Sequence, residues 1–229
     1  MSEYKKIHGI HVQALASDPS NLGAGQVWYN TTTNKLKITA VSTSGAWATG
    51  GNMATSRQQQ AGAGTQTAGL AFGGTTGPTT NVTEHYDGSA WTAGGNMGTS
   101  RYALAGAGTQ TTGLAFGGTP TTNATEHYDG SAWTAGGNMG TGRYMLAGCG
   151  TDTAGLAFGG YTSGTTNATE HYDGSAWTAG GNMGTGRYNM GSAGTLSAGL
   201  AFGGYDGNTY NATEEYAGPG ITTETITSS

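Results

Sequence analysis

Three histidines recur at equivalent places in the chain and are the first candidates for metal chemistry. They are His85, His127 and His171, and a fourth copy of the same segment has Glu215 in that place. Zinc needs all of its ligands within about 2.3 Å of one ion. Equivalent positions on separate β-sheets cannot meet so closely, because even neighbouring strands lie about 4.8 Å apart. We therefore expect no metal site, and we assign the histidines a packing or hydrogen-bonding role.

Each of these copies also carries an acidic pair of the kind that hydrolyses glycosidic bonds. The pairs are Glu84 with Asp87, Glu126 with Asp129, and Glu170 with Asp173. A catalytic pair is normally unique in a chain, because its two carboxyl groups need different surroundings to hold different pKa values. Here the pair is copied, and each aspartate precedes a glycine as in a turn. We predict that the protein is not an enzyme and has no catalytic residue.

The remaining chemical candidates are weaker. Cys149 is the only cysteine and stands where other copies have alanine, so we expect a small buried residue and no intrachain disulfide. The glycine-rich runs lack the lysine that follows a phosphate-binding loop, and they precede no predicted helix. We therefore expect no bound cofactor.

These candidates are all positioned by a repeat that fills most of the 229 residues. A phenylalanine and a tryptophan each recur with successive steps of 44, 42 and 44 residues, at Phe72, Phe116, Phe158 and Phe202, and at Trp47, Trp91, Trp133 and Trp177. A fixed period of this length is typical of solenoids, propellers and arrays.

The composition indicates a core of small residues with a few aromatic rings per copy. The chain has 45 glycines and 9% aromatic residues, but only 9% charged residues and a net charge of -5. Eight lysines and arginines are too few for a nucleic-acid surface. No apolar run approaches the roughly 20 residues of a membrane helix, and the N-terminus does not resemble a secretion signal. We expect no nucleic-acid partner, no membrane insertion, and synthesis in a cytoplasm.

Each copy divides into four short strand candidates separated by turn residues. The first follows an arginine, and the others read GLAFGG, TEHYDG and AWTAGG with small changes. No helical periodicity is present. The arginines are Arg57, Arg101, Arg143 and Arg187, which we expect to bind backbone carbonyls or carboxylates between neighbouring copies.

An arginine-led first strand, a Gly-Gly pair ending the second, and a later tyrosine and tryptophan together resemble the kelch repeat. The resemblance covers residues 46–217 and implies an all-β, kelch-like β-propeller of about four four-stranded blades. The last copy lacks its own tryptophan, whereas Trp47 precedes every other element. Trp47 is thus expected to complete the blade begun at Arg187. Two alternatives stay open: neighbouring chains complete an open array, or the C-terminal segment 218–229 supplies the strand through Ile221 and Ile226.

Residues 1–45 lie outside the repeat and form a predicted β attachment or oligomerisation segment. Two strands are predicted, at 26–30 and 35–41, and in the second Leu36 and Ile38 alternate with lysines as in a half-buried strand. The run DPSNLGAGQVWYN, leading into glycine- and threonine-rich copies, resembles the start of many virion proteins of tailed bacteriophages.

If the repeated positions are scaffold, binding specificity should lie where the copies differ. One such place is the loop after Gly-Gly, and the other is the triplet after the arginine, which reads QQQ, YAL, YML and YNM. The candidate binding residues are Tyr161, Thr162, Ser163, Tyr205, Asp206, Asn208 and Tyr210. Tyrosine, asparagine, aspartate and serine suit carbohydrate or protein surfaces.

The two resemblances together imply a non-enzymatic structural component of a bacteriophage virion, in a fibre, tail or capsid appendage. The N-terminal segment would dock on other virion proteins, and the propeller would face a host-surface glycan or protein. A homo-oligomer is expected, a trimer being one form. The alternative is a soluble lectin-like or carbohydrate-active kelch propeller.

Overall fold

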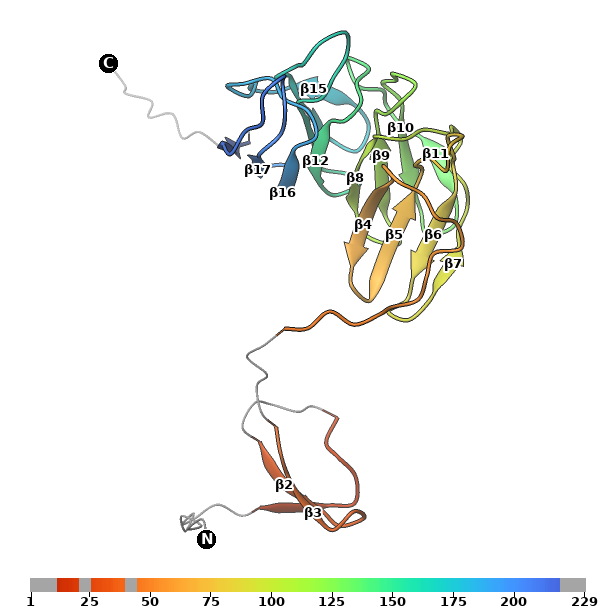
Figure 1. Cartoon of the computed structure of the whole chain (residues 1–229), viewed down its shortest axis with the longest axis vertical. Helices are drawn as coiled ribbons and strands as arrows, with labels where there is room; N and C mark the ends of the chain where they lie inside the picture. Colours follow the sequence, from red (N-terminus) through yellow and green to blue (C-terminus); the bar gives the residue numbers. More distant parts are fainter. Residues whose placement is uncertain (1–11, 21–25, 40–44, 219–229) are drawn as a thin grey trace, which may run out of the picture. The chain divides into compact units, whose positions relative to one another are not determined.

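A computed structural model describes residues 12–20, 26–39 and 45–218 of the chain. Every regular element in these ranges is a β-strand, and the strands form five sheets of three or four strands each (Figure 1). The expected all-β class is confirmed. The chain divides into two compact units, Met1–Thr49 and Gly50–Ser229.

The N-terminal unit is a sheet of three short strands, β1 (Gln13–Leu15), β2 (Val27–Asn30) and β3 (Lys35–Ile38). β2 pairs with β1 in parallel and with β3 in antiparallel. Asp18 ties the sheet together, because it accepts hydrogen bonds from Trp28 Nε1 at 3.0 Å, Asn30 Nδ2 at 2.8 Å and Lys37 Nζ at 2.6 Å. These bonds, the one from Lys37 foremost, lower the pKa of Asp18 to about 2.

The prediction that Leu36 and Ile38 form the buried side of their strand is wrong. Their side chains are 66% and 67% exposed. The alternate residue Lys37 bonds Asp18, which also holds the buried ring of Trp28. Tyr29 lies directly opposite Leu36 and is also exposed. The polar network therefore determines which side is covered, and an apolar face stays open. The predicted continuation of this strand beyond residue 39 lies outside the described residues.

The repeat body contains four sheets whose strands follow one another in chain order. The first has β4 (Ala61–Thr65), β5 (Ala68–Phe72), β6 (Thr83–Tyr86) and β7 (Trp91–Ala93). The second has β8 (Ala105–Gly108), β9 (Gly113–Phe116), β10 (Thr125–Tyr128) and β11 (Trp133–Ala135). The third has β12 (Ala147–Gly150), β13 (Gly155–Phe158), β14 (Thr169–Tyr172) and β15 (Trp177–Ala179). The fourth has β16 (Gly191–Gly194), β17 (Ala198–Phe202) and β18 (Thr213–Ala217).

Glycines on the first strands of the second and third sheets allow the preceding sheet to pack closely. A Cβ atom on Gly106 would lie 2.6 Å from the ring tip of Phe72, and one on Gly148 would lie 2.3 Å from that of Phe116. Both rings are fully buried. The glycines therefore make room for the aromatic ring of the preceding sheet, which is why so much glycine is compatible with a packed core.

The Gly-Gly pair links each sheet to the next. Gly73 and Gly74 have φ angles of 66° and 102°, which side chains rarely allow. Gly74 N donates to Arg101 O at 2.9 Å, and the same bond recurs between Gly118 and Arg143. The pair ends β5 and brings the chain against the backbone of the following copy.

The four sheets form an open row within the part of the chain that the structure describes. β4 contacts β8, β8 contacts β12, and β12 contacts β16, but no comparable contact joins β16 to β4. Figure 1 shows these four strands following one another along an arc. The fourth sheet has three strands among the described residues, and Trp47 is fully exposed and belongs to no strand. The structure therefore does not show the expected completion of this sheet by Trp47. Ile221 and Ile226 lie outside the described residues.

Candidate binding surface

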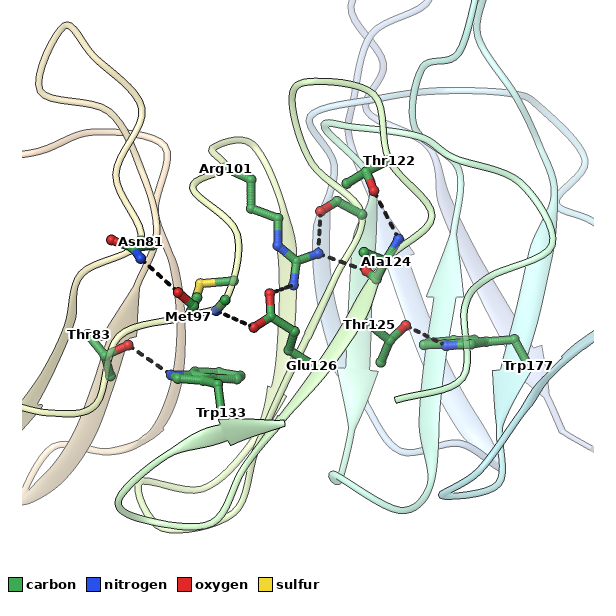
Figure 2. Close-up of polar contacts among 12 residues, drawn as sticks. Asn81, Thr83, Met97, Arg101, Thr122, Ala124, Thr125, Glu126, Trp133 and Trp177 are labelled. Atoms are coloured by element: carbon green, nitrogen blue, oxygen red, sulfur yellow. Dashed lines mark hydrogen bonds and ion pairs between the residues drawn. The ribbon is translucent and has the colours of Figure 1, made fainter. Parts of the chain in front are cut away.

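The side chain of each repeated arginine forms its hydrogen bonds and its ion pair within its own sheet. Arg101 donates to the carbonyls of Gly117 at 2.9 Å and Ala124 at 2.7 Å, and its second nitrogen pairs with Glu126 Oε1 at 2.9 Å (Figure 2). The other carboxylate oxygen of Glu126 accepts from Gly98 N at 2.6 Å. Every polar group of Glu126 is thus used, as a buried charge requires.

The same ion pair is present in all four copies. The distances are 3.1 Å for Arg57–Glu84, 2.9 Å for Arg101–Glu126, 2.8 Å for Arg143–Glu170 and 2.5 Å for Arg187–Glu214. Burial lowers the pKa of Arg101 and Arg143, and the paired glutamate opposes that shift. The prediction that arginine side chains join neighbouring copies is wrong, since both partners belong to one sheet. It is the arginine carbonyl that reaches the preceding sheet.

The tryptophans join neighbouring sheets. Trp133 donates from Nε1 to Thr83 Oγ1 at 2.9 Å, and its ring lies 4.8 Å from Phe72 and 4.9 Å from Tyr128, centroid to centroid. Trp177 makes the equivalent bond to Thr125 Oγ1 (Figure 2). Each ring is therefore placed between its own tyrosine and the phenylalanine of the sheet before it.

The histidines also connect adjacent sheets. His85 Nε2 shares a hydrogen bond of 2.6 Å with the Tyr128 hydroxyl, and the His127–Tyr172 distance is the same. Burial lowers the pKa of His85 and raises that of Tyr128, which favours a hydrogen bond between a neutral imidazole and a neutral phenol. The predicted hydrogen-bonding role is confirmed. Within the described ranges, no group of three His, Cys, Asp or Glu residues is placed to hold a metal ion.

The two members of each acidic pair have different structural roles. Glu84 pairs with Arg57, whereas Asp87 accepts hydrogen bonds from Ser89 N, Ser89 Oγ and Ala90 N at 2.7 to 2.8 Å. These bonds lower the pKa of Asp87. The predicted turn role of the aspartate is confirmed, and the two carboxylates serve separate partners.

Cys149 is a buried, free thiol, as predicted. Burial raises its pKa to about 11, so the reactive thiolate is scarce at neutral pH.

The two segments in which the copies differ lie side by side. In each copy the residue after the arginine forms a backbone bridge with the first residue after Gly-Gly: Gln58 with Thr75, Tyr102 with Thr119, Tyr144 with Tyr161, and Tyr188 with Tyr205. We call these segments the variable face, comprising residues 58–60, 75–80, 102–104, 119–122, 144–146, 161–166, 188–190 and 205–210. The sequence marked both segments as variable, but it did not predict their pairing.

Four tyrosines form a continuous row on the variable face of the third and fourth sheets. The ring centroids are 5.6 Å apart for Tyr144–Tyr161, 5.5 Å for Tyr161–Tyr188 and 5.5 Å for Tyr188–Tyr205. Tyr205 is exposed and the others are half-buried. The row offers aromatic faces and phenol groups together, which is a combination suited to recognition.

Polar residues adjoin this row at the fourth sheet. The Tyr210 hydroxyl donates to Asp206 Oδ2 at 2.8 Å, and Asn208 N donates to Asp206 Oδ1 at 3.1 Å. The first bond lowers the pKa of Asp206 and raises that of Tyr210. The Arg187 guanidinium carbon lies 5.6 Å from the centre of the Tyr210 ring.

The structure thus brings together five of the seven candidate binding residues. Tyr161 and Tyr205 belong to the tyrosine row, and Asp206, Asn208 and Tyr210 share one network in the loop after Tyr205. Thr162 and Ser163 occupy the equivalent loop of the third sheet, where Thr162 N donates to Gly164 O at 3.0 Å. Sequence reasoning did not name Tyr144 and Tyr188 as candidates, although both open a variable triplet.

The middle residues of the triplets line a pocket that belongs to the variable face. Gln59, Ala103, Met145 and Asn189 have φ angles of 56°, 52°, 54° and 53°, which are uncommon for residues other than glycine. The N–H of each of the last three donates to the carbonyl of the one before it, at 2.7 to 3.0 Å. All four line the pocket, together with the next residue of each triplet. A regular backbone therefore presents side chains of four different types.

Comparison of the chain with models of known protein families gives no match, and comparison with curated proteins gives none either. The described residues include no helix long and apolar enough to cross a membrane.

Proposed function

We propose that the chain is a non-enzymatic structural protein whose kelch-like repeat body, an open propeller arc, presents the variable face to a binding partner. The observation that carries this proposal is the bridge between the two variable segments in every copy. The residues that repeat without change are used in ion pairs, turns and contacts between sheets. What differs between copies is therefore gathered on one face of a rigid framework.

The tyrosine row favours a carbohydrate or protein partner. Tyrosine supplies a large contact area with few rotatable bonds, and neighbouring aspartate and asparagine supply directional hydrogen bonds. The Asp206 carboxylate, already held by Tyr210 and Asn208, is preorganised as an acceptor for a ligand hydroxyl.

The proposed setting is a bacteriophage virion, on which the N-terminal unit docks after synthesis in the host cytoplasm. The resemblance of the DPSNLGAGQVWYN run to the start of virion proteins of tailed bacteriophages supports this setting. So does the apolar face of the N-terminal sheet, where Tyr29, Leu36 and Ile38 are exposed. Such a face is suited to burial against another virion protein.

A soluble lectin-like or carbohydrate-active propeller is the second candidate, and the tyrosine row beside Asp206 favours it. This function does not explain the exposed apolar face of the N-terminal sheet. Hydrolysis of a carbohydrate would also require a pair of carboxylates other than the glutamates that are paired with arginines.

Binding is tested with a double variant, Tyr161→Ala with Tyr205→Ala, on a panel of glycans and on host envelope fragments. We expect at least a tenfold loss of affinity with an unchanged circular dichroism spectrum. Tyr102→Ala is the matched control, because Tyr102 belongs to the equivalent bridge of the second sheet, opposite Thr119, and lies outside the tyrosine row. Equal binding by the double variant and the wild type would remove this role for the variable face.

The virion setting is tested by mass spectrometry of particles purified from the biological source of the chain. We expect the protein in those particles, and we expect Leu36→Glu with Ile38→Glu to abolish its incorporation without unfolding it. Lys35→Glu on the same strand is the control. Absence of the wild-type protein from particles would favour the soluble alternative.

A further inference from the structure

The fourth sheet contains a pocket lined by the residues that hold a tryptophan in the other sheets. Around Trp133 these residues are Phe72, Thr83, Gly113 and Tyr128. The pocket is lined by their equivalents one interface further on, Phe158, Thr169, Gly199 and Tyr216, with Met183 and Ala201 beside them. It therefore has the ring contacts and the hydroxyl acceptor that an indole needs.

The chain supplies no tryptophan to this pocket from the position that fills the others. Among the described residues the fourth sheet ends at β18, and the sequence has Ile221 at the position equivalent to Trp177, five residues after the tyrosine. Trp47 is the surplus member of the series, since it lies ten residues before Arg57 just as Trp91 lies ten before Arg101. Its side chain is fully exposed.

We propose that this pocket binds Trp47 of a second copy of the chain, whose residues 46–50 add to β18 as the fourth strand. The register of the third sheet gives the expected pairing, because Tyr172 lies opposite Trp177 and Glu170 opposite Ala179. Trp47 of the second copy then lies opposite Tyr216, and Thr49 opposite Glu214. The edge of β18 that pairs with no other described strand, and the hydrogen-bonding groups of the added strand, are satisfied together.

Two aromatic residues at the two ends of the row, Phe202 and Trp91, also fit this arrangement. Phe202 is 44% exposed, although its equivalents Phe72 and Phe116 are fully buried. Trp91 at the other end packs on Tyr86, 5.1 Å between centroids, but lacks a phenylalanine partner among the described residues. Placing Trp91 of the second copy on Phe202 reproduces the Trp133–Phe72 contact.

The fourth sheet also differs from the others at the histidine position, where it has Glu215. At the inner junctions, a histidine shares a hydrogen bond with the tyrosine of the next sheet. The second copy would present Tyr86 at this position, whose hydroxyl can donate to the Glu215 carboxylate. The junction between copies would then use a carboxylate where the inner junctions use imidazole.

The open row favours a second copy over Trp47 of the same chain. Closure within one chain would bring β16 against β4, yet these strands lie at opposite ends of the arc and share no contact comparable with those of successive sheets in the described part (Figure 1). The two ends present different and complementary surfaces. Such head-to-tail contacts generate a ring when the rotation closes and a filament when it does not.

The first test fills the pocket and measures association of the full chain by sedimentation velocity over a concentration series. Gly181 lines the pocket, and a Cβ there meets nothing within 4 Å, whereas at Gly137 the equivalent Cβ would lie 2.0 Å from Ser175 O of the next copy. Gly181→Leu is thus expected to fold and to weaken association at least about 30-fold, a loss typical of removing a tryptophan anchor.

Trp47→Ala should weaken association to a similar degree. Gly164→Leu is the matched control, because its Cβ also meets nothing within 4 Å but it lies away from the pocket. It should associate like the wild type. A wild-type chain that stays monomeric, or a Gly181→Leu chain that associates normally, would overturn the proposal.

The second test identifies the source of the strand. Ala48 and Glu215 lie opposite each other in the expected register, so single variants Ala48→Cys and Glu215→Cys, both with Cys149→Ala, are mixed and oxidised. We expect a disulfide-linked pair of chains, because directly opposed residues approach closely enough for a disulfide. Neither variant alone should form it.

The double variant carrying both cysteines distinguishes the two sources directly. Linkage between chains supports the proposal, and linkage confined within single chains would show closure by the same chain instead. The outcome is independent of the proposed function, because glycan or particle binding is read separately from association.

Discussion

The inner sheets of the repeat body differ from the end sheets in the number of neighbours that cover them. The second and third sheets are packed on both sides, and Phe116 and Leu114 between them are fully buried. In the fourth sheet the equivalent Phe202 is 44% exposed, and the side chain of Glu214 is 30% exposed. Similar sequences thus differ in burial according to their place in the row, as expected for a repeat protein whose units contact only their neighbours.

The largest expected loss of stability comes from the ion pair of an inner sheet, and the loss at the end sheet should be about half as large. Arg143→Ala leaves Glu170 buried without its charge partner, which should cost about 4 kcal/mol of unfolding free energy. Arg187→Ala leaves the more exposed Glu214 and should cost about 2 kcal/mol, since water can solvate it. Urea unfolding followed by circular dichroism measures both. Equal losses would contradict the comparison.

The phenylalanines should give the next largest loss, with at least as great a contrast between an inner and an end sheet. Phe116→Ala opens a cavity against Gly148 and Trp177 and should cost about 3 kcal/mol. Phe202→Ala should cost less than about 1 kcal/mol at concentrations where the chain is monomeric, because its ring is already partly in water. A rise in the cost of Phe202→Ala with protein concentration would connect it to the interface between copies.

The tryptophan hydrogen bond should give a smaller contrast. Trp177→Phe keeps most of the ring and removes the bond to Thr125, at a cost of about 1 kcal/mol. Trp91→Phe is the control, because no hydrogen bond of its indole nitrogen is found among the described residues, and it should change the melting temperature little. Similar melting temperatures for both variants would show that the bond contributes nothing net.

The smallest expected effect is on pH dependence. Burial lowers the pKa of His85 and His171 below the ordinary value of 6.5. Between the folded and unfolded pKa values the unfolded chain binds more protons, so stability should fall as the pH is lowered through about 6.5. His85→Gln with His171→Gln should flatten this dependence in thermal melts between pH 7 and pH 5. An unchanged slope would show that these junctions do not titrate.

Much of the local structure could be predicted from the sequence. The strands around Phe72, Tyr86 and Trp91 were expected from turn residues and from the copies themselves, because a feature repeated four times is unlikely to be chance. The turn role of Asp87 and the burial of Cys149 followed for the same reason. In each case the decisive interactions are short-range or identical in every copy.

The exposed side of the N-terminal strand could not be predicted, because alternation shows which residues share a face but not which face is covered. The network of Asp18 with Trp28 and Lys37 decides that, and it joins residues far apart in sequence. The partner of each arginine could not be predicted from the sequence for a similar reason. Arg143 and Glu170 meet only when β14 pairs with β13.

The sequence by itself determined the period, the four-part copy, the all-β class and the positions where copies differ, because these depend on residue type and spacing. Only the tertiary structure decided that the variable segments pair, that four tyrosines form a row, and that the described sheets form an open row with a pocket lined by Phe158, Thr169 and Tyr216 at its end. Those features depend on the angle at which each sheet packs on the next, which arises from the summed contacts of a whole interface rather than from any one residue.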